Sequence, residues 1–288
     1  MKIFEIIGTI YEDVFCNTFS QACYVFLCGG AGKEHMRNKV RPTLESEKFQ
    51  ILYPEDLFIE MLNRNKKSDL LEYENLLAEN SDIICIICES IGSAVELGAF
   101  IQSDNIKEKM VVAINQKYAR DRSFVMMGPV KHLKKVNEEN VVVFKPDDSV
   151  ALGSSLSKAF RKLHKRGKSN KTQSFDTLSA YIAFIPMIVY FFQTVSRKSL
   201  HKNLKVFLGE RGTLHKRYNE FFNASIKYLI KAGILVSEFN IDEKDETFSL
   251  STKGYNETLG LIERSSATER TILHDRIRCA ILKEQLNN

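Results

Sequence analysis

Short apolar runs alternate with helix-like segments over residues 22–145. The runs are ACYVFLC, FQILY, DIICIIC, MVVAI and VVVF, and most of their residues are Val, Ile or other large apolar types. Between them lie segments with helical spacing of apolar positions, at 68–80, from about 93, and near 128–135. Apolar strands separated by helices are typical of βαβ units, in which helices cover both faces of a parallel sheet. The pattern therefore predicts an α/β domain over residues 22–145.

The pattern becomes mostly helical after residue 176. Helices are predicted at 177–196, 199–209 and 213–232, and two strand-like segments follow at 234–239 and 247–250 around the acidic turn IDEKDE. Three helices and a hairpin predict a winged helix-turn-helix, whose third helix would enter a groove of DNA. An acidic turn repels phosphates. A protein-binding winged helix therefore stays open beside a DNA-binding one.

These patterns divide the chain into four parts. Residues 1–21 predict an amphipathic docking segment, residues 22–145 the α/β domain, residues 146–175 a basic helix with a polar linker, and residues 176–288 the winged-helix domain. In the last part, residues 255–286 predict a closing helix for packing or assembly. We expect a homo-oligomer or a higher assembly.

Charge is divided unevenly between the halves of the chain. Residues 1–145 hold 18 Lys and Arg against 21 Asp and Glu, whereas residues 146–288 hold 23 against 15, net charges of −3 and +8. A basic half suggests a polyanion such as nucleic acid, although a solvated surface and linker would have the same composition. The candidate phosphate contacts are Lys158, Arg161, Lys162, Lys165, Arg166 and Lys168 in the basic segment, and Lys216 and Arg217 on the predicted third helix.

Composition narrows the class of protein further. A chain of 288 residues with 44% hydrophobic and 27% charged residues is ordinary for a soluble protein. Its six cysteines lack the spacing of a disulfide framework, which favours a reducing cytoplasm. Cys85 and Cys88 form a CxxC, but no second pair completes a zinc site, so we expect no metal. The longest apolar run, 181–192, is too short to span a bilayer.

Two segments that follow predicted strands have the composition of ligand-binding loops. In parallel sheets ligands bind beyond the carboxyl ends of the strands, where loops and helix N-termini converge. The first segment is FLCGGAGKEH, in which Gly29 and Gly30 let the backbone approach a phosphate or a sugar. It matches neither the GxGxxG fingerprint nor a P-loop. A plain turn therefore remains an alternative.

The second segment is ESIGSAVELGAF, residues 89–100. Ser90, Gly92 and Ser93 offer hydroxyls and free N–H groups to an anion at a helix start. Glu96 would project beside that anion, and a carboxylate is the group that stabilises or attacks the anomeric carbon of a sugar. Glu is also favoured near helix starts by the helix dipole alone, which is the structural alternative.

GSAVELGAF after an apolar strand, with SDII upstream and a strand ending in CGG, resembles the nucleoside 2-deoxyribosyltransferase family and its deoxynucleoside-monophosphate glycosidase relatives. The resemblance implies a Rossmann- or flavodoxin-like parallel sheet. It also implies that Glu96 is the nucleophile, that Ser90 and Gly92 contact the phosphate or sugar, and that Gly29 and Gly30 line the opposite wall. The position where the family typically has an Asp falls on Glu74.

A second resemblance covers nearly the whole chain. FLCGG, YPEDLF, ENLLAENSDII, ESIGSAVELGAF and RSFVMMGPVKHL, followed by a basic segment and a predicted winged helix, resemble the effectors of type II retrons. The resemblance implies an antiphage toxin controlled by a reverse transcriptase and its multicopy single-stranded DNA (msDNA). The family is associated with N-glycosidic cleavage of nucleotides, including NAD. Tyr53 and Glu55 of YPEDLF could contact ligand, or could end a strand and cap a helix.

Two functions from different classes follow. The first is an N-glycosidase toxin that takes NAD or another nucleotide as substrate and needs no cofactor, with Glu96 attacking C1′. The second is a non-catalytic, nucleotide-sensing regulator that binds DNA through its winged helix. The sequence shows no group to protonate a leaving base, which favours the second. Nicotinamide leaves NAD from a cationic state and needs no such acid, which makes NAD attractive for the first.

Overall fold

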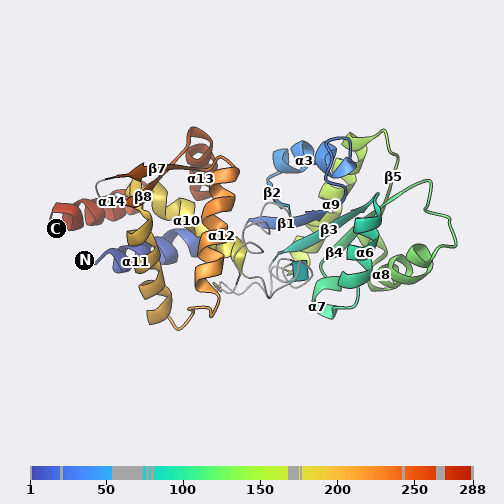
Figure 1. Ribbon diagram of the computed structural model, residues 1–288, viewed down its shortest axis with the longest axis horizontal. Coiled ribbons are helices and arrows are strands. Elements are labelled where there is room, and N and C mark those ends of the chain that lie inside the picture. The colour runs from blue at the N-terminus through green and yellow to red at the C-terminus, as the bar shows by residue number, and fades with distance from the viewer. Residues whose placement is uncertain are drawn as a thin grey trace. The chain divides into compact units, whose positions relative to one another are not determined.

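The computed structural model describes residues 2–19, 22–53, 74–75, 78, 81–167, 175, 177–241, 244–263 and 270–286. The chain divides into two compact units. Residues 22–171 form the α/β unit, and residues 1–21 together with 172–288 form the helical unit (Figure 1). None of the described helices is both long enough and apolar enough to cross a membrane.

The α/β unit is built on a five-stranded sheet in which every neighbouring pair is parallel. The strand order is β2-β1-β3-β4-β5. The elements are β1 (Cys23–Cys28), α3 (Met36–Ser46), β2 (Phe49–Leu52), β3 (Ile83–Cys88), α6 (Ile91–Phe100), α7 (Asp104–Lys107), β4 (Met110–Asn115), η2 (Met126–Val130), α8 (Lys131–Val136), η3 (Glu138–Asn140), β5 (Val141–Phe144) and α9 (Ser149–Gly167). The predicted α/β class with a parallel sheet is confirmed. Most of the helix expected at 68–80 lies outside the described residues.

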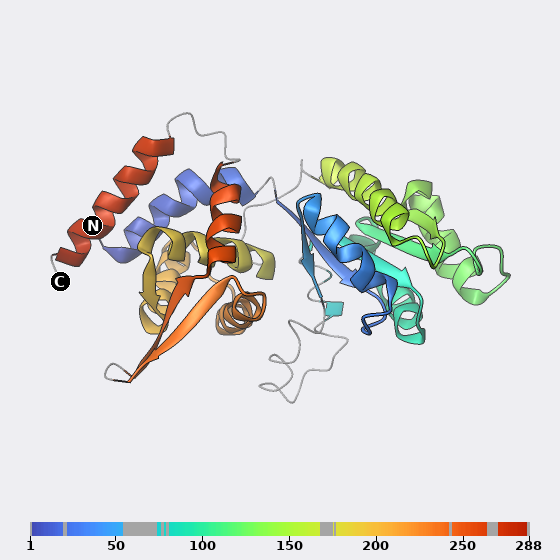
Figure 2. The ribbon, with the colours of Figure 1, turned by 90° about the horizontal axis from the view of Figure 1, so that it is seen from above.

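Helices cover both faces of this sheet. Figure 2 shows α3 and α9 side by side on one face, where they enclose a core that includes Val25, Leu27 and Cys85. On the other face, the ring of Phe26 lies 6.4 Å from that of Phe100 in α6. Successive strand residues point to opposite faces. Because both faces are covered, the central strands are apolar at every position instead of alternating with polar residues.

Helix α9 packs on the sheet of the α/β unit. Leu152, Leu156 and Phe160 are buried in the core under α3 and α9. Gly153 passes so close to α3 that a Cβ there would lie 2.8 Å from Cγ2 of Thr43. The prediction of a separate basic segment over 146–175 is therefore corrected for α9. Its cations occupy the exposed side of an amphipathic helix, and its apolar side completes the α/β core.

The helical unit combines helices with a three-stranded antiparallel sheet of order β6-β8-β7. Its elements are α1 (Ile3–Ile10), η1 (Tyr11–Phe15), α2 (Cys16–Phe19), α10 (Leu178–Phe192), β6 (Thr194–Ser196), α11 (Arg197–Glu210), α12 (Tyr218–Lys231), β7 (Leu235–Asn240), β8 (Asp245–Leu250), α13 (Thr252–Glu263) and α14 (Arg270–Leu286). Since α12 begins at Tyr218, Lys216 precedes it and Arg217 is its N-cap residue. The prediction that these two cations lie on the helix is wrong.

The N-terminal segment is part of the core of the helical unit. The ring of Tyr11 packs against those of Phe175, Phe184 and Phe207, with centroids 5.4–5.9 Å apart. Phe15 is fully buried and contacts Phe175 and Phe184 as well. A fully buried large apolar side chain contributes about 1.5–3 kcal/mol to stability. The segment therefore stabilises a unit whose other elements begin more than 150 residues later in the chain.

Candidate active site at the carboxyl edge of the sheet

The site lies at the point in the sheet where the connection after β1 leads to one side and the connection after β3 leads to the other. Strand β1 leads through α3 to β2 at one side, whereas β3 leads through α6 to β4 at the other. The crossovers α3 and α6 therefore lie on opposite faces, and the carboxyl ends of β1 and β3 flank the switch point between them. In doubly wound sheets of the order 2-1-3-4-5, ligands bind in the crevice at this point.

The turn after β1 is closely packed against protein atoms. Gly29 has φ +153°, and a Cβ there would lie 3.2 Å from Cβ of Arg37 and from the carbonyl oxygen of Ile87. A Cβ on Gly30 would lie 2.3 Å from the ring of His35. Both glycines are therefore required by the approach of neighbouring residues. A side chain at Gly30 would meet the His35 ring before it met a ligand.

A carboxylate of the chain occupies the start of α3. Glu89, at the end of β3, accepts hydrogen bonds from the backbone N–H groups of Met36 at 3.0 Å and Arg37 at 3.4 Å. Nδ1 of His35 lies 3.6 Å from the same carboxylate, whose side chain is 13% exposed. These N–H groups begin a helix and have no partner within it. Glu89 therefore ties the end of β3 to the start of α3 across the switch point.

Two serines hold the start of α6. The Oγ atom of Ser90 accepts a hydrogen bond from the N–H of Ser93, while Oγ of Ser93 donates to the carbonyl of Ser90 and accepts from its N–H. Ser93 is 1% exposed. The N–H groups of Ile91 and Gly92 have no acceptor among the residues that the structure describes, and both residues are exposed. The serine hydroxyls therefore cap the helix, and its first two residues are exposed.

Charged side chains gather around the thiol of Cys28, the last residue of β1. Burial raises the pKa of this thiol well above its usual range, the carboxylates of Glu96 and Glu74 raise it further, and the Arg37 guanidinium opposes them. The Cys88 thiol, at the end of β3, also has a pKa raised by burial and by Glu96. Oε2 of Glu96 is shielded from solvent. Glu74, which precedes β3 in the chain, and Glu96, which follows it, therefore both act on the same thiol.

Tyr53 holds α3 in position. It is 7% exposed, and its hydroxyl donates to Oδ1 of Asn38 at 2.8 Å. The guanidinium carbons of Arg37 and Arg41 lie 4.5 and 4.6 Å from its ring centroid. These contacts give Tyr53 a structural role against α3, and its contact with a ligand stays a prediction. Glu55, its predicted partner in ligand binding, lies outside the described residues.

The predicted phosphate contacts on α9 differ in availability. Arg161 forms an ion pair with Glu47, and Lys162 forms one with Glu139 at 2.5 Å. Arg166 lies 3.8 Å from Glu139. Lys158 and Lys165 are exposed, and no ion pair is recorded for either within the described part of the chain. Lys168 lies outside the described residues.

In the helical unit, Lys216 is exposed, whereas Arg217 pairs with Glu220 at 2.8 Å. The acidic hairpin is also partly internal. Asp245 is 7% exposed, and Glu246 pairs with Arg197 at 2.6 Å. The hairpin therefore presents less negative charge than its sequence suggests.

Sequence reasoning missed three residues of the site: Cys28, Arg37 and Glu89. Arg37 is 2% exposed, which is rare for a guanidinium. Glu89 directly follows an apolar strand and precedes an N-cap serine, a signal that was present in the sequence. The burial of Arg37 depends on Tyr53 and could not be deduced from local sequence.

Comparison with known proteins independently supports the resemblance to retron effectors. Residues 33–237 match the family model described as "STM3845 retron effector protein". Two proteins of Escherichia coli are similar to the chain. The "Retron Ec86 putative ribosyltransferase/DNA-binding protein" is 36% identical over 141 residues, 48% of this chain and 46% of the relative. The "Retron Ec73 putative ribosyltransferase/DNA-binding protein" is 32% identical over 127 residues, 41% of this chain and 40% of the relative. The chain thus spans less than half the length of each of these relatives.

Proposed function

The chain belongs to the STM3845 retron effector family, and from this premise we propose that its α/β unit cleaves the N-glycosidic bond of a nucleotide. The resulting loss of an essential nucleotide would make the protein a toxin. The names of the two relatives, which include ribosyltransferase, support a reaction at a ribosyl carbon.

The position of Glu96 carries the proposal. Its carboxylate lies at the β1/β3 switch point, with one oxygen shielded from solvent and with Glu74 and Arg37 acting on the same neighbouring thiol. A carboxylate with a shielded oxygen is suited to attack an electron-poor carbon, because little water must be displaced from it. The guanidinium of Arg37 offsets part of the negative charge that the two carboxylates bring to this edge.

The reaction would proceed in two displacements. Glu96 attacks C1′ as the bond from C1′ to the base nitrogen breaks, and the bonding electrons leave with the base. Water then attacks C1′ of the glycosyl ester and releases the Glu96 carboxylate. We assign to Glu74, the second carboxylate that acts on the Cys28 thiol, the role of orienting that water.

The start of α6 is the proposed phosphate site. Ile91 and Gly92 are exposed at the start of the helix, where the dipole favours an anion and backbone N–H groups can bind one. The hydroxyls of Ser90 and Ser93 cap the helix and so hold these N–H groups in place. A phosphate bound there would put its sugar on the side of the helix from which Glu96 projects.

NAD is the favoured substrate. Nicotinamide is bound in NAD as a cationic pyridinium and leaves as a neutral molecule, so no acid has to protonate it. The sequence motifs of this edge assign no group to protonate a purine or a pyrimidine. Adenine or guanine nucleotides would need such a group.

The direct test is product analysis. The purified chain is incubated with NAD and with a panel of ribo- and deoxyribonucleotides, and released bases are separated by chromatography. We expect free nicotinamide and ADP-ribose from NAD. Release of another base would change the substrate and keep the reaction class. If no nucleotide loses its base while several bind, the chain is instead a nucleotide-sensing regulator.

The helical unit is the proposed contact to the retron complex. Its order of helix α10, strand β6, helices α11 and α12, and strands β7 and β8 supports a winged helix-turn-helix. Near the hairpin turn, Phe239 and Ile241 are 68% and 79% exposed. An exposed apolar hairpin end favours a protein surface over a phosphate backbone. We therefore propose that this hairpin contacts the reverse transcriptase, and that Lys216 of this unit adds a contact to msDNA. Lys158 and Lys165 on α9 of the α/β unit are further proposed msDNA contacts.

A pull-down of the reverse transcriptase complex by the full chain separates the two contributions. Nuclease treatment and rising salt should weaken binding in part, because phosphate contacts release counterions. Replacing Phe239 and Ile241 by Ser should remove the fraction that survives nuclease. Unchanged binding by that variant would exclude the hairpin from the contact.

A further inference from the structure

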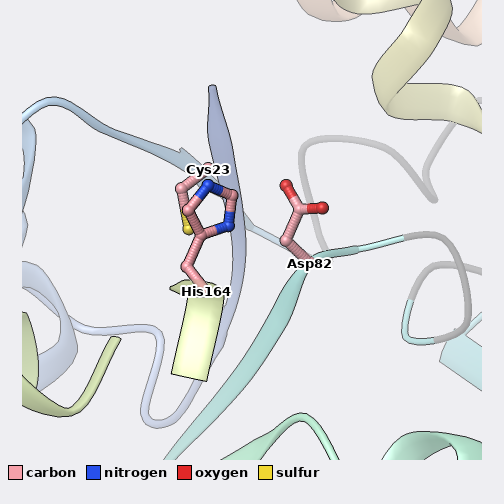
Figure 3. A group of neighbouring side chains, drawn as sticks. All are labelled: Cys23, Asp82 and His164. Atoms are coloured by element: carbon pink, nitrogen blue, oxygen red, sulfur yellow. The ribbon is translucent and has the colours of Figure 1, made fainter. Parts of the chain in front are cut away.

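Three side chains with metal-ligating atoms meet at the amino edge of the α/β sheet, opposite the edge that carries Glu96. Cys23 begins β1, Asp82 directly precedes β3, and His164 lies in the last turn of α9. Their ligand atoms, a thiol sulfur, a carboxylate oxygen and a ring nitrogen, all lie within 4.8 Å of one another. Figure 3 shows the three side chains gathered around the start of β1.

The carboxylate of this group is held in place by β1. Oδ2 of Asp82 accepts a hydrogen bond from the N–H of Tyr24 at 2.8 Å, and the N–H of Asp82 donates to the carbonyl of Tyr24 at 3.0 Å. Tyr24 follows Cys23 directly, so the carboxylate and the thiol share one rigid support. Backbone hydrogen bonds of this kind orient the carboxylate ligands of metal ions.

We propose that Cys23, Asp82 and His164 bind one divalent transition ion, for which zinc is the best match. Zinc is bound in proteins by thiolate, imidazole and carboxylate, whereas magnesium and calcium avoid thiolates. In a tetrahedral zinc site the ligand atoms lie about 3.5 Å apart. The observed group would close to that spacing by small side-chain rotations, and water would take the fourth position.

A Cys-His-Asp arrangement also occurs in nucleophilic enzymes, but the surroundings favour an ion. The group lies at the amino edge of a parallel sheet, whereas substrates bind at the carboxyl edge. Cys23 is only 5% exposed, which leaves little room for a substrate carbonyl beside its sulfur. An ion needs only the small space between the three ligands.

Binding would join three parts of the α/β unit that are distant in sequence. The ligands come from β1, from the residue before β3, and from the end of α9, the last described element before the helical unit resumes. An ion would therefore hold the last turn of α9 on the sheet. This role is structural and is independent of the proposed glycosidase reaction.

Metal content tests the proposal directly. The full chain is loaded with zinc, passed through gel filtration with a weak chelator, and analysed by mass spectrometry for metals. We expect about one zinc per chain. Cys23→Ser and His164→Gln should each lose the ion. Asp82→Asn should bind it much more weakly, although its amide oxygen can still accept the Tyr24 N–H and keep the local backbone intact.

Cys85→Ser is the matched control. Cys85 is fully buried on the same face of the sheet as Cys23, but it lies in the middle of β3. This variant should retain the ion. Cobalt provides a second measurement, because thiolate bound to cobalt absorbs in the near ultraviolet. The band should be present in the wild type and in Cys85→Ser, and absent in Cys23→Ser.

Stability gives the remaining readout. A strong chelator should lower the melting temperature of the wild-type chain and leave that of Cys23→Ser unchanged, because only the first has an ion to lose. Wild-type protein that retains no zinc, or zinc retained equally by Cys23→Ser, would overturn the proposal. The three side chains would then be a hydrogen-bonded group that binds no ion.

Discussion

The starts of α3 and α6 flank the same switch point but are completed differently. At α3, the N–H groups of Met36 and Arg37 donate to the carboxylate of Glu89. At α6, the Ser90 hydroxyl accepts from the N–H of Ser93, and the N–H groups of Ile91 and Gly92 have no acceptor within the described part of the chain. A helix start favours one anion. Because α3 already has an anion from the chain itself, the start of α6 is the one that we propose for the phosphate of a ligand.

This contrast distinguishes two loops that have similar sequences. FLCGGAGKEH and ESIGSAVELGAF both place small residues between an apolar strand and a helix. In the first, Gly29 and Gly30 make room for Arg37, Ile87 and His35. In the second, a Cβ on Gly92 would have only Oγ of Ser90 within 4 Å, at 3.8 Å. Glycine therefore serves internal packing after β1 and leaves open space after β3.

The largest expected effect is the loss of N-glycosidic cleavage when Glu96 on α6 is replaced. Glu96→Gln preserves the shape of the side chain and removes its charge, so cleavage should fall by about 10³-fold or more. Released base is measured at saturating nucleotide, together with growth of expressing cells. Glu108→Gln, an exposed change at the end of α7, is the control and should keep full activity. Near-normal turnover in Glu96→Gln would remove this residue from the reaction.

The next effect concerns the occupied helix start. Glu89→Gln removes the charge that α3 receives from β3, and we expect a loss of about 1–2 kcal/mol in the free energy of unfolding. Chemical denaturation measures it. Glu34→Gln is the control, since Glu34 also lies near His35, at 3.4 Å, but its side chain is 75% exposed. Equal stability of the two variants would mean that Glu89 does not support the start of α3.

A carboxylate placed on α6 should make the two helix starts alike. Gly92→Asp would put a negative charge where Glu89 acts on α3, and the helix should gain about 0.3–1 kcal/mol. Nucleotide affinity should fall more than about tenfold, because like charges about 5 Å apart repel by on the order of 3 kcal/mol at an effective dielectric constant of about 20. Isothermal titration with nucleotide measures the affinity.

Gly98→Asp makes the same change further along α6, where no atom lies within 4 Å of an added Cβ. It should leave the affinity nearly unchanged. If Gly92→Asp binds nucleotide as well as Gly98→Asp does, the phosphate does not lie at the start of α6.

The smallest effect near neutral pH concerns Cys28, which lies between the two helix starts. Its thiol pKa is raised well above the ordinary value of 9.0, by burial first and then by Glu96 and Glu74. Above pH 9 the unfolded chain loses this proton and the folded chain keeps it, so stability should fall as pH rises. Thermal melts across the alkaline range should show a shallower decline for Cys28→Ala. Identical slopes would contradict the raised pKa.

The sequence was sufficient for the elements and their class. Apolar runs without polar alternation predict a parallel sheet covered on both faces, because the spacing of apolar residues shows which faces of a strand are buried. The motif around Glu96 and the order of elements after residue 176 also led from local patterns to the retron effector family. The predicted starts of helices are less accurate than the predicted types of elements. The pattern predicts Lys216 and Arg217 on the third helix, whereas that helix begins at Tyr218. Charged residues fit either a first turn or the loop before it.

Only the tertiary structure decided which side chains meet. Glu74, Cys28, Arg37 and Glu96 come together because β1 and β3 are neighbours in a sheet whose order differs from the order of the chain. The same pairing of strands brings Cys23 to Asp82, and the return of α9 across the sheet adds His164. Local sequence determines whether a segment forms a strand or a helix. Strand order and helix docking depend on contacts between distant residues, and no local pattern contains them.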